Sequence, residues 1–260
     1  KLLRRAGRER AGHFLVEGAQ AVREALAWSG TGSGRVHELF VTPAAAGRHA
    51  ELVAAATAAG TRIVRATEKA VASLSETVTP QGLVAVCDLV DVSVGVALRG
   101  SPVLVAVPVG VADPGNAGTV VRVADAAGAD AVLLAGDTVD PHNGKAVRAS
   151  TGSLFHLPVA RDRDPLAVLD ACRDAGLALL VADGRGELDL HDPATADVLS
   201  RPTAWILGGE AHGVPAMVAQ RADHRVRIPV YGRAESLNLA TAAAICLYAG
   251  AAAQRRPGRS

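Results

Sequence analysis

The chain contains 260 residues, of which 49% are hydrophobic, 20% charged and 3% aromatic, and its formal net charge at pH 7 is +1. This length can bury a substantial core in one large domain or two small ones, and the frequent Gly and Ala suit an alternating α/β protein. The near-zero net charge excludes bulk electrostatics as evidence for a nucleic-acid partner, and the scarcity of aromatic residues argues against a base-stacking sheet.

The cysteine pattern indicates a reducing compartment. Cys87, Cys172 and Cys246 are isolated in apolar segments, and no Cys or His cluster has metal-ligand spacing. We therefore predict a cytoplasmic protein whose cysteines are reduced core residues, with no metal site. The sequence begins at Lys1 and contains neither a signal-peptide segment nor a convincing transmembrane run.

Positive charge gathers at both ends of the chain. The residues concerned are Lys1, Arg4, Arg5, Arg8 and Arg10 at the start and Arg255, Arg256 and Arg259 at the end. Such runs can contact phosphate groups, although solvated termini are the commoner explanation. The two interpretations stay open at this point.

The first ninety residues have the pattern of a small α/β unit. Apolar segments predict strands at residues 13–17, 36–41, 61–64 and 83–89, and apolar residues at helical spacing predict helices after Gly18 and over residues 44–59. The next segment contains Gly95 and Gly100 and is expected to be a linker.

From residue 102 onward, strands and helices alternate. Residues 102–111 are nearly all apolar, as in a central parallel strand, and they lead into a tight loop at 113–118 and a helix ended by Gly128. Further strands are expected at residues 131–135, 154–159, 177–182 and 204–207, and helices at 145–151, 165–175 and 215–222. No GxGxxG sequence follows a strand, so a dinucleotide-binding fold is not indicated.

The last stretch begins as a short strand, residues 225–230, in which Pro229 removes one amide donor. A polar loop follows, and Ser236 can cap a helix over residues 237–253 that is small or apolar almost all the way round. A helix of that kind is buried on most faces, between its own sheet and something else such as a second copy of the chain. On one interpretation, the first turn of this helix presents its backbone amides and the positive end of the helix dipole to a ligand. On the other, Ser236 caps a core helix and has no further role.

Three segments between residues 113 and 248 resemble, in order, the signature motifs of the SpoU/TrmH family of RNA ribose 2'-O-methyltransferases. They are DPGNAGTVVRVADAAGAD, which holds Asn116, Gly118 and Arg122; WILGGEAHGVP, which holds Glu210; and IPVYGRAESLNLATAAAICLY, which holds Ser236 and Asn238. Taken singly, each has a plain explanation as a cap, a surface charge or a tight turn. One departure is that Leu239 and Ala240 stand where the family often has a β-branched residue.

The resemblance implies a SPOUT architecture: an α/β domain with a parallel sheet, helices on both faces and a C-terminal trefoil knot. The words FLVEG, ELFVT and TPQGLVAVCD also resemble the L30e-like substrate-binding domain common in the family. We therefore expect an N-terminal domain at residues 1–92, a linker at 93–101 and a methyltransferase domain at 102–260. A homodimer through the C-terminal domain is implied as well.

The resemblance also implies a set of site residues. Arg122 would lie closest to the ribose hydroxyl, assisted by Asn116, Glu210, Ser236 and Asn238. The residues that would hold S-adenosylmethionine are Leu207, Gly208, Gly209, Ile228, Pro229, Val230, Ser236 and Leu237. Candidates for RNA contact are Arg4, Arg5, Arg8, Lys145 and Arg148. Because a guanidinium is a poor base in water, Arg122 is either unusually poised or anchors the neighbouring phosphate while a weaker base takes the proton.

The predicted function is S-adenosylmethionine-dependent methyl transfer to a ribose 2'-hydroxyl in RNA, with 23S ribosomal RNA favoured because a separate N-terminal domain suits a large structured target. One alternative is a tRNA 2'-O-methyltransferase, and another is a catalytically silent RNA-binding protein in ribosome assembly. A nucleotide-dependent oxidoreductase is disfavoured by the missing fingerprint. Neither a membrane nor a metal is expected to take part.

Overall fold

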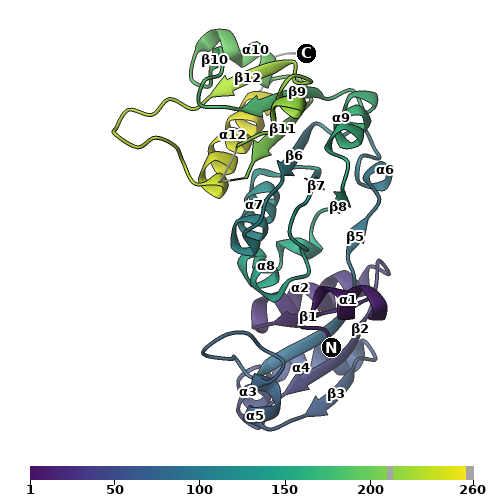
Figure 1. The fold of residues 1–260 in the computed structure, drawn as a ribbon. Helices are drawn as coiled ribbons and strands as arrows, with labels where there is room; N and C mark the ends of the chain where they lie inside the picture. The colour runs from purple at the N-terminus through teal and green to yellow at the C-terminus, as the bar shows by residue number, and fades with distance from the viewer. Residues whose placement is uncertain (210–212, 256–260) are drawn as a thin grey trace. The chain divides into compact units, whose positions relative to one another are not determined.

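The structure is a computed structural model that describes residues 1–209 and 213–255. Glu210, Arg256 and Arg259, which the sequence singled out, lie outside the described residues. The chain forms two compact units, residues 1–90 with 140–156 and residues 91–139 with 157–260 (Figure 1). Segment 140–156 thus leaves the C-terminal half of the sequence to pack in the first unit. Within the described ranges, no helix is long and apolar enough to cross a membrane.

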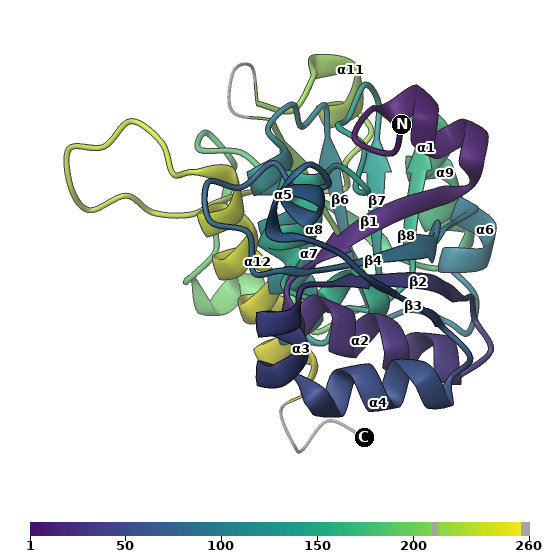
Figure 2. The same ribbon diagram turned by 90° about the horizontal axis from the view of Figure 1, so that it is seen from below.

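The first unit contains a four-stranded mixed sheet (Figure 2). Its strands, in sheet order, are β1 (His13–Glu17), β4 (Leu83–Asp88), β2 (Val36–Val41) and β3 (Arg62–Arg65). The first two pairs are antiparallel and the pair β2–β3 is parallel. The strands predicted at 13–17 and 36–41 are confirmed to the residue; burial alternates regularly along β1, and along β2 the alternation is interrupted at residues 37–38.

Seven helical segments complete the first unit: α1 (Arg5–Ala11), α2 (Ala19–Gly30), α3 (Pro43–Arg48), α4 (Ala50–Ala58), α5 (Glu68–Ala72), α8 (Gly144–Ser150) and the 3-10 turn η1 (Ser153–Phe155). The single helix predicted over 44–59 is wrong, since His49 has φ −126° and ψ 44° and interrupts it. The strand predicted at 154–159 is also wrong. Phe155 belongs to η1, and its ring centroid lies 6.0 Å from that of Phe14 and 5.5 Å from that of Trp28. The pattern of a short apolar run cannot distinguish a buried strand from a buried helical segment.

The second unit is built on an eight-stranded sheet in which every neighbouring pair is parallel. Its strands, in sheet order, are β10 (Leu188–Asp189), β12 (His224–Arg227), β9 (Ala178–Ala182), β11 (Thr203–Gly208), β6 (Leu104–Val109), β7 (Ala131–Ala135), β8 (Val159–Asp162) and β5 (Asp91–Val92). The central strand β6 is buried along its whole length, as its apolar sequence predicted.

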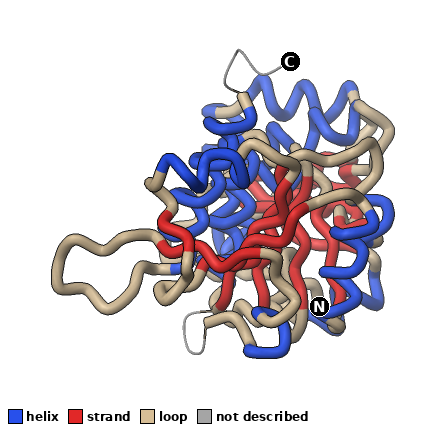
Figure 3. The backbone as a smooth tube through the Cα atoms, turned by 90° about the horizontal axis from the view of Figure 1, so that it is seen from above, coloured by secondary structure: helices blue, strands red, loops and turns tan. Residues whose placement is uncertain are grey.

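Helices cover both faces of this sheet (Figure 3), which confirms the predicted α/β class. The helical segments of this unit are α6 (Val94–Ala97), α7 (Pro114–Ala127), α9 (Pro165–Asp174), η2 (Pro193–Thr195), α10 (Ala196–Leu199), α11 (Ala216–Ala219) and α12 (Leu239–Gln254). Val105 and Val107 of β6 face α6 and α9, whereas Leu104 lies against Gly250 of α12. α6 lies within the segment expected to be a linker, and Ala97 is buried in this core.

Candidate functional site

The first motif forms the start of α7. The amide of Asn116 donates to Asp113 Oδ1 at 2.9 Å, so Asp113 is the N-cap, and Pro114 occupies the first helical position. Asn116 therefore lies in the first helical turn, and the predictions that it lies in a loop or caps the helix are wrong. This placement leaves the side-chain amide of Asn116 available for a contact across the helix start.

The third motif forms the start of α12, two residues later than expected. Asn238 caps the helix, because its Oδ1 accepts from the amides of Ala240 at 2.9 Å and Thr241 at 3.3 Å. Ser236 is exposed and lies before the cap, so the prediction of a Ser236 cap is wrong. Both residue types favour the N-cap position, and the sequence could not choose between them.

A side-chain hydrogen bond joins these two helix starts. Asn238 Nδ2 donates to Asn116 Oδ1 at 3.1 Å, across 122 residues of sequence. At the other end, the Tyr248 hydroxyl donates to the Ala126 carbonyl at 3.3 Å, so α7 and α12 run in the same direction. Their two N-termini, each carrying a partial positive charge, therefore lie at the same end of the pair.

An open cleft of about 480 Å³ lies at the carboxyl ends of β9, β11 and β12. Its volume is within the range of small-molecule sites, and this edge is where open α/β sheets bind ligands. The lining residues are Ala182, Asp183, Gly184, Arg185, Leu207, Gly208, Gly209, Gly213, Val226, Ile228, Val230, Glu235, Ser236, Leu237, Leu239 and Ala242. The lining includes all the residues that the sequence nominated for cofactor binding except Pro229.

The paired glycines of the second motif are needed for backbone packing. A Cβ on Gly208 would lie 2.1 Å from the carbonyl carbon of Gly213, and one on Gly209 would lie 2.6 Å from the oxygen of Gly110. The Gly209 amide also donates to the Val109 carbonyl at 3.1 Å. Three backbone segments therefore approach one another so closely here that neither position has room for a side chain. At Gly208 and Gly209 the cleft is consequently lined by main chain.

Arg122 lies on α7 and is exposed, while its neighbours Val121 and Ala124 are buried. Among the described residues, its guanidinium has no hydrogen-bond or ion-pair partner. The helix thus presents a cation to solvent, in the same element whose first turn carries Asn116. Such an exposed guanidinium can accept an anionic group such as a phosphate without displacing a carboxylate.

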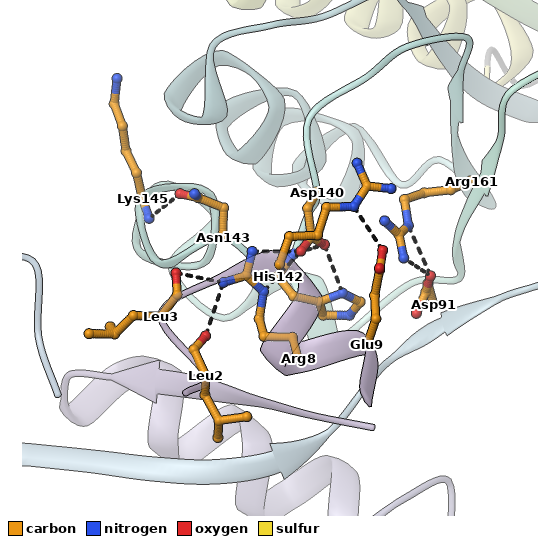
Figure 4. Close-up of polar contacts among 11 residues, drawn as sticks. Leu2, Leu3, Arg8, Glu9, Asp91, Asp140, His142, Asn143, Lys145 and Arg161 are labelled. Carbon is orange, nitrogen blue, oxygen red and sulfur yellow. Dashed lines mark hydrogen bonds and ion pairs between the residues drawn. The ribbon is translucent and has the colours of Figure 1, made fainter. Parts of the chain in front are cut away.

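The prediction that Arg8 contacts RNA is not supported by its position in the structure. Its side chain is buried, with 3% of the residue exposed, and its Nε and Nη2 atoms donate to Asp140 Oδ2 at 2.9 and 2.7 Å (Figure 4). Its Nη1 atom donates to the carbonyls of Leu2 and Leu3. Because this guanidinium neutralises a buried carboxylate, it cannot also reach a phosphate.

The other four RNA candidates remain at the surface of the first unit. Arg4, Arg5 and Lys145 are exposed, and Arg148 is half-buried with its Nη1 atom 3.5 Å from Glu17 Oε2.

All three cysteines are buried and free. Burial raises the pKa of the Cys172 thiol to about 12, so it is an unreactive core residue.

Known proteins share the features of both units. Residues 103–248 match the SpoU rRNA Methylase family and residues 1–85 match the MRM3-like substrate binding domain. The chain is 35% identical, over 95% of its length and 92% of the relative, to the 23S rRNA (guanosine(2553)-2'-O)-methyltransferase RlmP of Bacillus subtilis.

Two solved structures resemble the whole chain. An AdoMet-bound rRNA methyltransferase from Sinorhizobium meliloti superposes with a TM-score of 0.82 at 30% identity, covering 96% of this chain and 90% of that one. The SpoU methyltransferase AviRb from Streptomyces viridochromogenes, in complex with AdoMet, has a TM-score of 0.81 at 30% identity, covering 96% and 94%. Both similarities extend over the two units.

Proposed function

The chain belongs to the SpoU rRNA methylase family, and we propose that it transfers a methyl group from S-adenosylmethionine to a ribose 2'-hydroxyl of 23S ribosomal RNA. The observation that carries this proposal is the meeting of three sequence-distant motifs at one edge of a parallel sheet. Asn116 and Asn238 are hydrogen-bonded there, beside a cleft whose lining includes Gly208 and Gly209. The full-length relative that acts on 23S rRNA supports the choice of RNA. A cytoplasmic location follows from that substrate, because ribosomes assemble there.

The cleft suits the proposed cofactor chemically. Leu207, Val226 and Ile228 give it apolar walls for an adenine ring, and Asp183 and Ser236 offer polar groups for ribose and amino-acid atoms. We propose that the main chain at residues 207–209, 228–230 and 236–237 holds the cofactor. When bound, S-adenosylmethionine supplies its own electrophilic methyl group, so the proposed reaction needs no metal.

The catalytic contribution of the chain is positioning of the RNA ribose. We assign to Arg122 the phosphate next to the reacting ribose, because an exposed guanidinium binds phosphate well and is a poor proton acceptor. Asn116, Ser236 and Asn238 would orient the hydroxyl, with Glu210 assigned from its motif alone. The hydroxyl proton would pass to a weaker base such as water. Holding the reacting atoms in line is sufficient for a large acceleration.

We propose that two copies pair through the second unit. A stripe of α12 consists of Thr241, Ile245, Tyr248 and Ala252, which recur at helical spacing; Ile245 is half-buried and Tyr248 is 53% exposed. An apolar stripe of this kind on a helix is suited to an isologous interface. We assign RNA binding to the first unit, through Arg4, Arg5, Lys145 and Arg148. The proposed family architecture also includes a C-terminal trefoil knot.

Site mapping of 2'-O-methyl groups tests the function. Purified protein is incubated with S-adenosylmethionine and unmodified 23S rRNA, 16S rRNA or total tRNA, and methylated riboses are located by resistance to alkaline cleavage. We expect one modified nucleotide in 23S rRNA and none in the other RNAs. Modification of tRNA alone would favour the tRNA alternative. Cofactor binding without methylation of any RNA, including intact ribosomal subunits, would overturn the proposal in favour of a silent RNA-binding protein.

A further inference from the structure

Two imidazoles and a carboxylate meet on the sheet of the first unit. His13 begins β1, Asp88 ends β4 directly opposite it, and His37 lies on β2 at the other side of β4. Asp88 Oδ1 is 3.4 Å from His13 Nε2 and 2.7 Å from His37 Nε2, and the two ring centroids are 4.2 Å apart. One ligand atom from each residue lies within 4.8 Å of the other two.

A β-bulge brings His37 to this place. Val36 pairs with Cys87 and Glu38 with Val86, so His37 is the extra residue between two consecutive pairs. With regular alternation His37 would share the buried face of Leu39, whereas at the bulge it reaches Asp88. Bulges commonly redirect a side chain in this way at functional positions.

The carboxylate is already oriented by the main chain. The amide of Arg35 donates to Asp88 Oδ2 at 2.9 Å, which leaves Oδ1 directed at the two imidazoles. A hydrogen bond of this type to the non-ligating oxygen is characteristic of metal-binding carboxylates. The three side chains therefore form a prearranged donor set on neighbouring strands, which are more rigid than loops.

The distances from Asp88 to the two imidazoles suit a tetrahedral ion. Metal–ligand distances of about 2.0–2.2 Å place the donor atoms of a tetrahedron about 3.3–3.6 Å apart. The His13–Asp88 separation of 3.4 Å falls within that range, and the His37–Asp88 contact of 2.7 Å would lengthen by less than about 1 Å on binding. The His13 and His37 side chains are 34% and 30% exposed, so water can complete the coordination.

We propose that His13, His37 and Asp88 form a binding site for a divalent transition-metal ion, with Zn²⁺ as the ion of choice. Two imidazoles and one carboxylate suit Zn²⁺, Co²⁺ or Ni²⁺, whereas Mg²⁺ and Ca²⁺ prefer oxygen ligands. The ion would tie β1, β4 and β2 together and stabilise the first unit. Sequence spacing concealed this site, because 24 and 51 residues separate its ligands and the third ligand depends on a bulge.

Zinc titration tests the site on the full chain. Protein stripped with a chelator is titrated with Zn²⁺ by calorimetry, and Co²⁺ substitution is followed by visible absorption. We expect one ion per chain and a higher Tm with Zn²⁺ than without it. His37→Gln and Asp88→Asn should each weaken binding at least about tenfold and abolish the Tm increase.

The matched control is His156→Gln. His156 also pairs with a carboxylate of the first unit, Glu24 at 3.0 Å, but outside the His13–His37–Asp88 site. This variant should bind Zn²⁺ as the unaltered chain does. His13→Gln serves as a second ligand variant should one of the others fail to fold, which the Tm of the metal-free protein reveals. Absence of binding by the unaltered chain, or equal binding by all variants, would overturn the proposal. The methylation assay is run with chelator present, so its result does not depend on whether the chain binds Zn²⁺.

Discussion

Arg8 of the first unit and Arg122 of the second differ in whether their charge is neutralised within the chain. In the first unit Arg8 is 3% exposed and donates both to Asp140 and to two main-chain carbonyls. In the second unit Arg122 is exposed on α7 and has no hydrogen-bond or ion-pair partner within the described part of the chain. The Arg8 guanidinium is thus a structural group whose charge is neutralised within the chain, whereas the charge of Arg122 is left for the phosphate that we propose it binds.

This difference extends to the other polar groups. The first unit encloses a network in which His142 bonds Asp140 at 3.1 Å through Nδ1 and accepts the Val90 amide through Nε2 at 3.2 Å. An accepting Nε2 requires a neutral imidazole whose proton is on Nδ1. In the second unit, Asn116 and Asn238 instead lie at helix starts beside an open cleft. The comparison predicts loss of stability from a change in the buried Arg8–Asp140 pair and loss of activity from a change at Arg122.

The largest effect is expected from Asp140→Ala. This change leaves the buried Arg8 guanidinium without its carboxylate, and removal of one partner from a buried ion pair costs about 3–5 kcal/mol. Urea unfolding monitored by Trp28 fluorescence, in a Trp205→Phe background, reports on the first unit alone. A loss below about 1 kcal/mol would mean that Arg8 and Asp140 do not stabilise this unit.

The same carboxylate sets an acid limit on stability. Burial raises the pKa of Asp140, but hydrogen bonds from His142 and Arg8 outweigh that effect and hold the pKa well below its ordinary value. A group with a lowered folded-state pKa contributes fully above its unfolded pKa of about 3.9, and the contribution is lost as the pH falls below it. Asp140→Asn should therefore be less stable near neutrality and show a shallower loss of stability below about pH 4.

Arg122→Ala should reduce methyl transfer at least about a hundredfold, equivalent to about 2.7 kcal/mol of activation free energy. Calorimetry should give an affinity for S-adenosylmethionine within a few-fold of the unaltered chain, because Arg122 does not line the cleft. Arg99→Ala is the matched control, since Arg99 is also exposed in the second unit. Undiminished turnover in the Arg122 variant would remove this residue from the mechanism.

A smaller effect separates the two candidate caps of α12. Asn238→Ala should destabilise the second unit by about 1 kcal/mol, because two helix amides lose their acceptor. Ser236→Ala should change stability by less than about 0.5 kcal/mol, since Ser236 is exposed and lies before the cap. Trp205 fluorescence, in a Trp28→Phe background, measures both. Equal losses would mean that Ser236 contributes to the helix start.

Local patterns predicted those parts of the fold that depend on neighbouring residues. The strand at 131–135 and those at 13–17 and 36–41 have the predicted bounds, because short apolar or alternating runs define them. Two-residue strands such as β5 and β10 carry no pattern, and their existence depends on pairing with distant strands. The interruption at His49 was hidden by a continuous alanine-rich sequence.

The candidate site was predictable in part for the same reason. Motif order nominated most of the cleft lining, but the Asn116–Asn238 bond joins residues 122 apart and follows only from helix packing. The partner of Arg8 is 132 residues away, in segment 140–156, so the sequence offered no reason to exclude Arg8 from RNA contact. Charge can be read from a sequence, whereas its neutralisation is decided by the fold.

Within the first unit, the smallest effect should come from Arg62→Ala, which makes the contrast between buried and exposed pairs quantitative. Arg62 Nη1 lies 3.0 Å from Glu38 Oε1, nearly the same separation as in the Arg8–Asp140 pair, but the Arg62 side chain is 75% exposed. Water screens such a pair, so the change should cost less than about 1 kcal/mol in the Trp28 unfolding assay with chelator present. A cost matching that of Asp140→Ala would show that distance rather than burial decides the stabilising effect of an ion pair in this unit. The distinction between the two kinds of arginine would then fail.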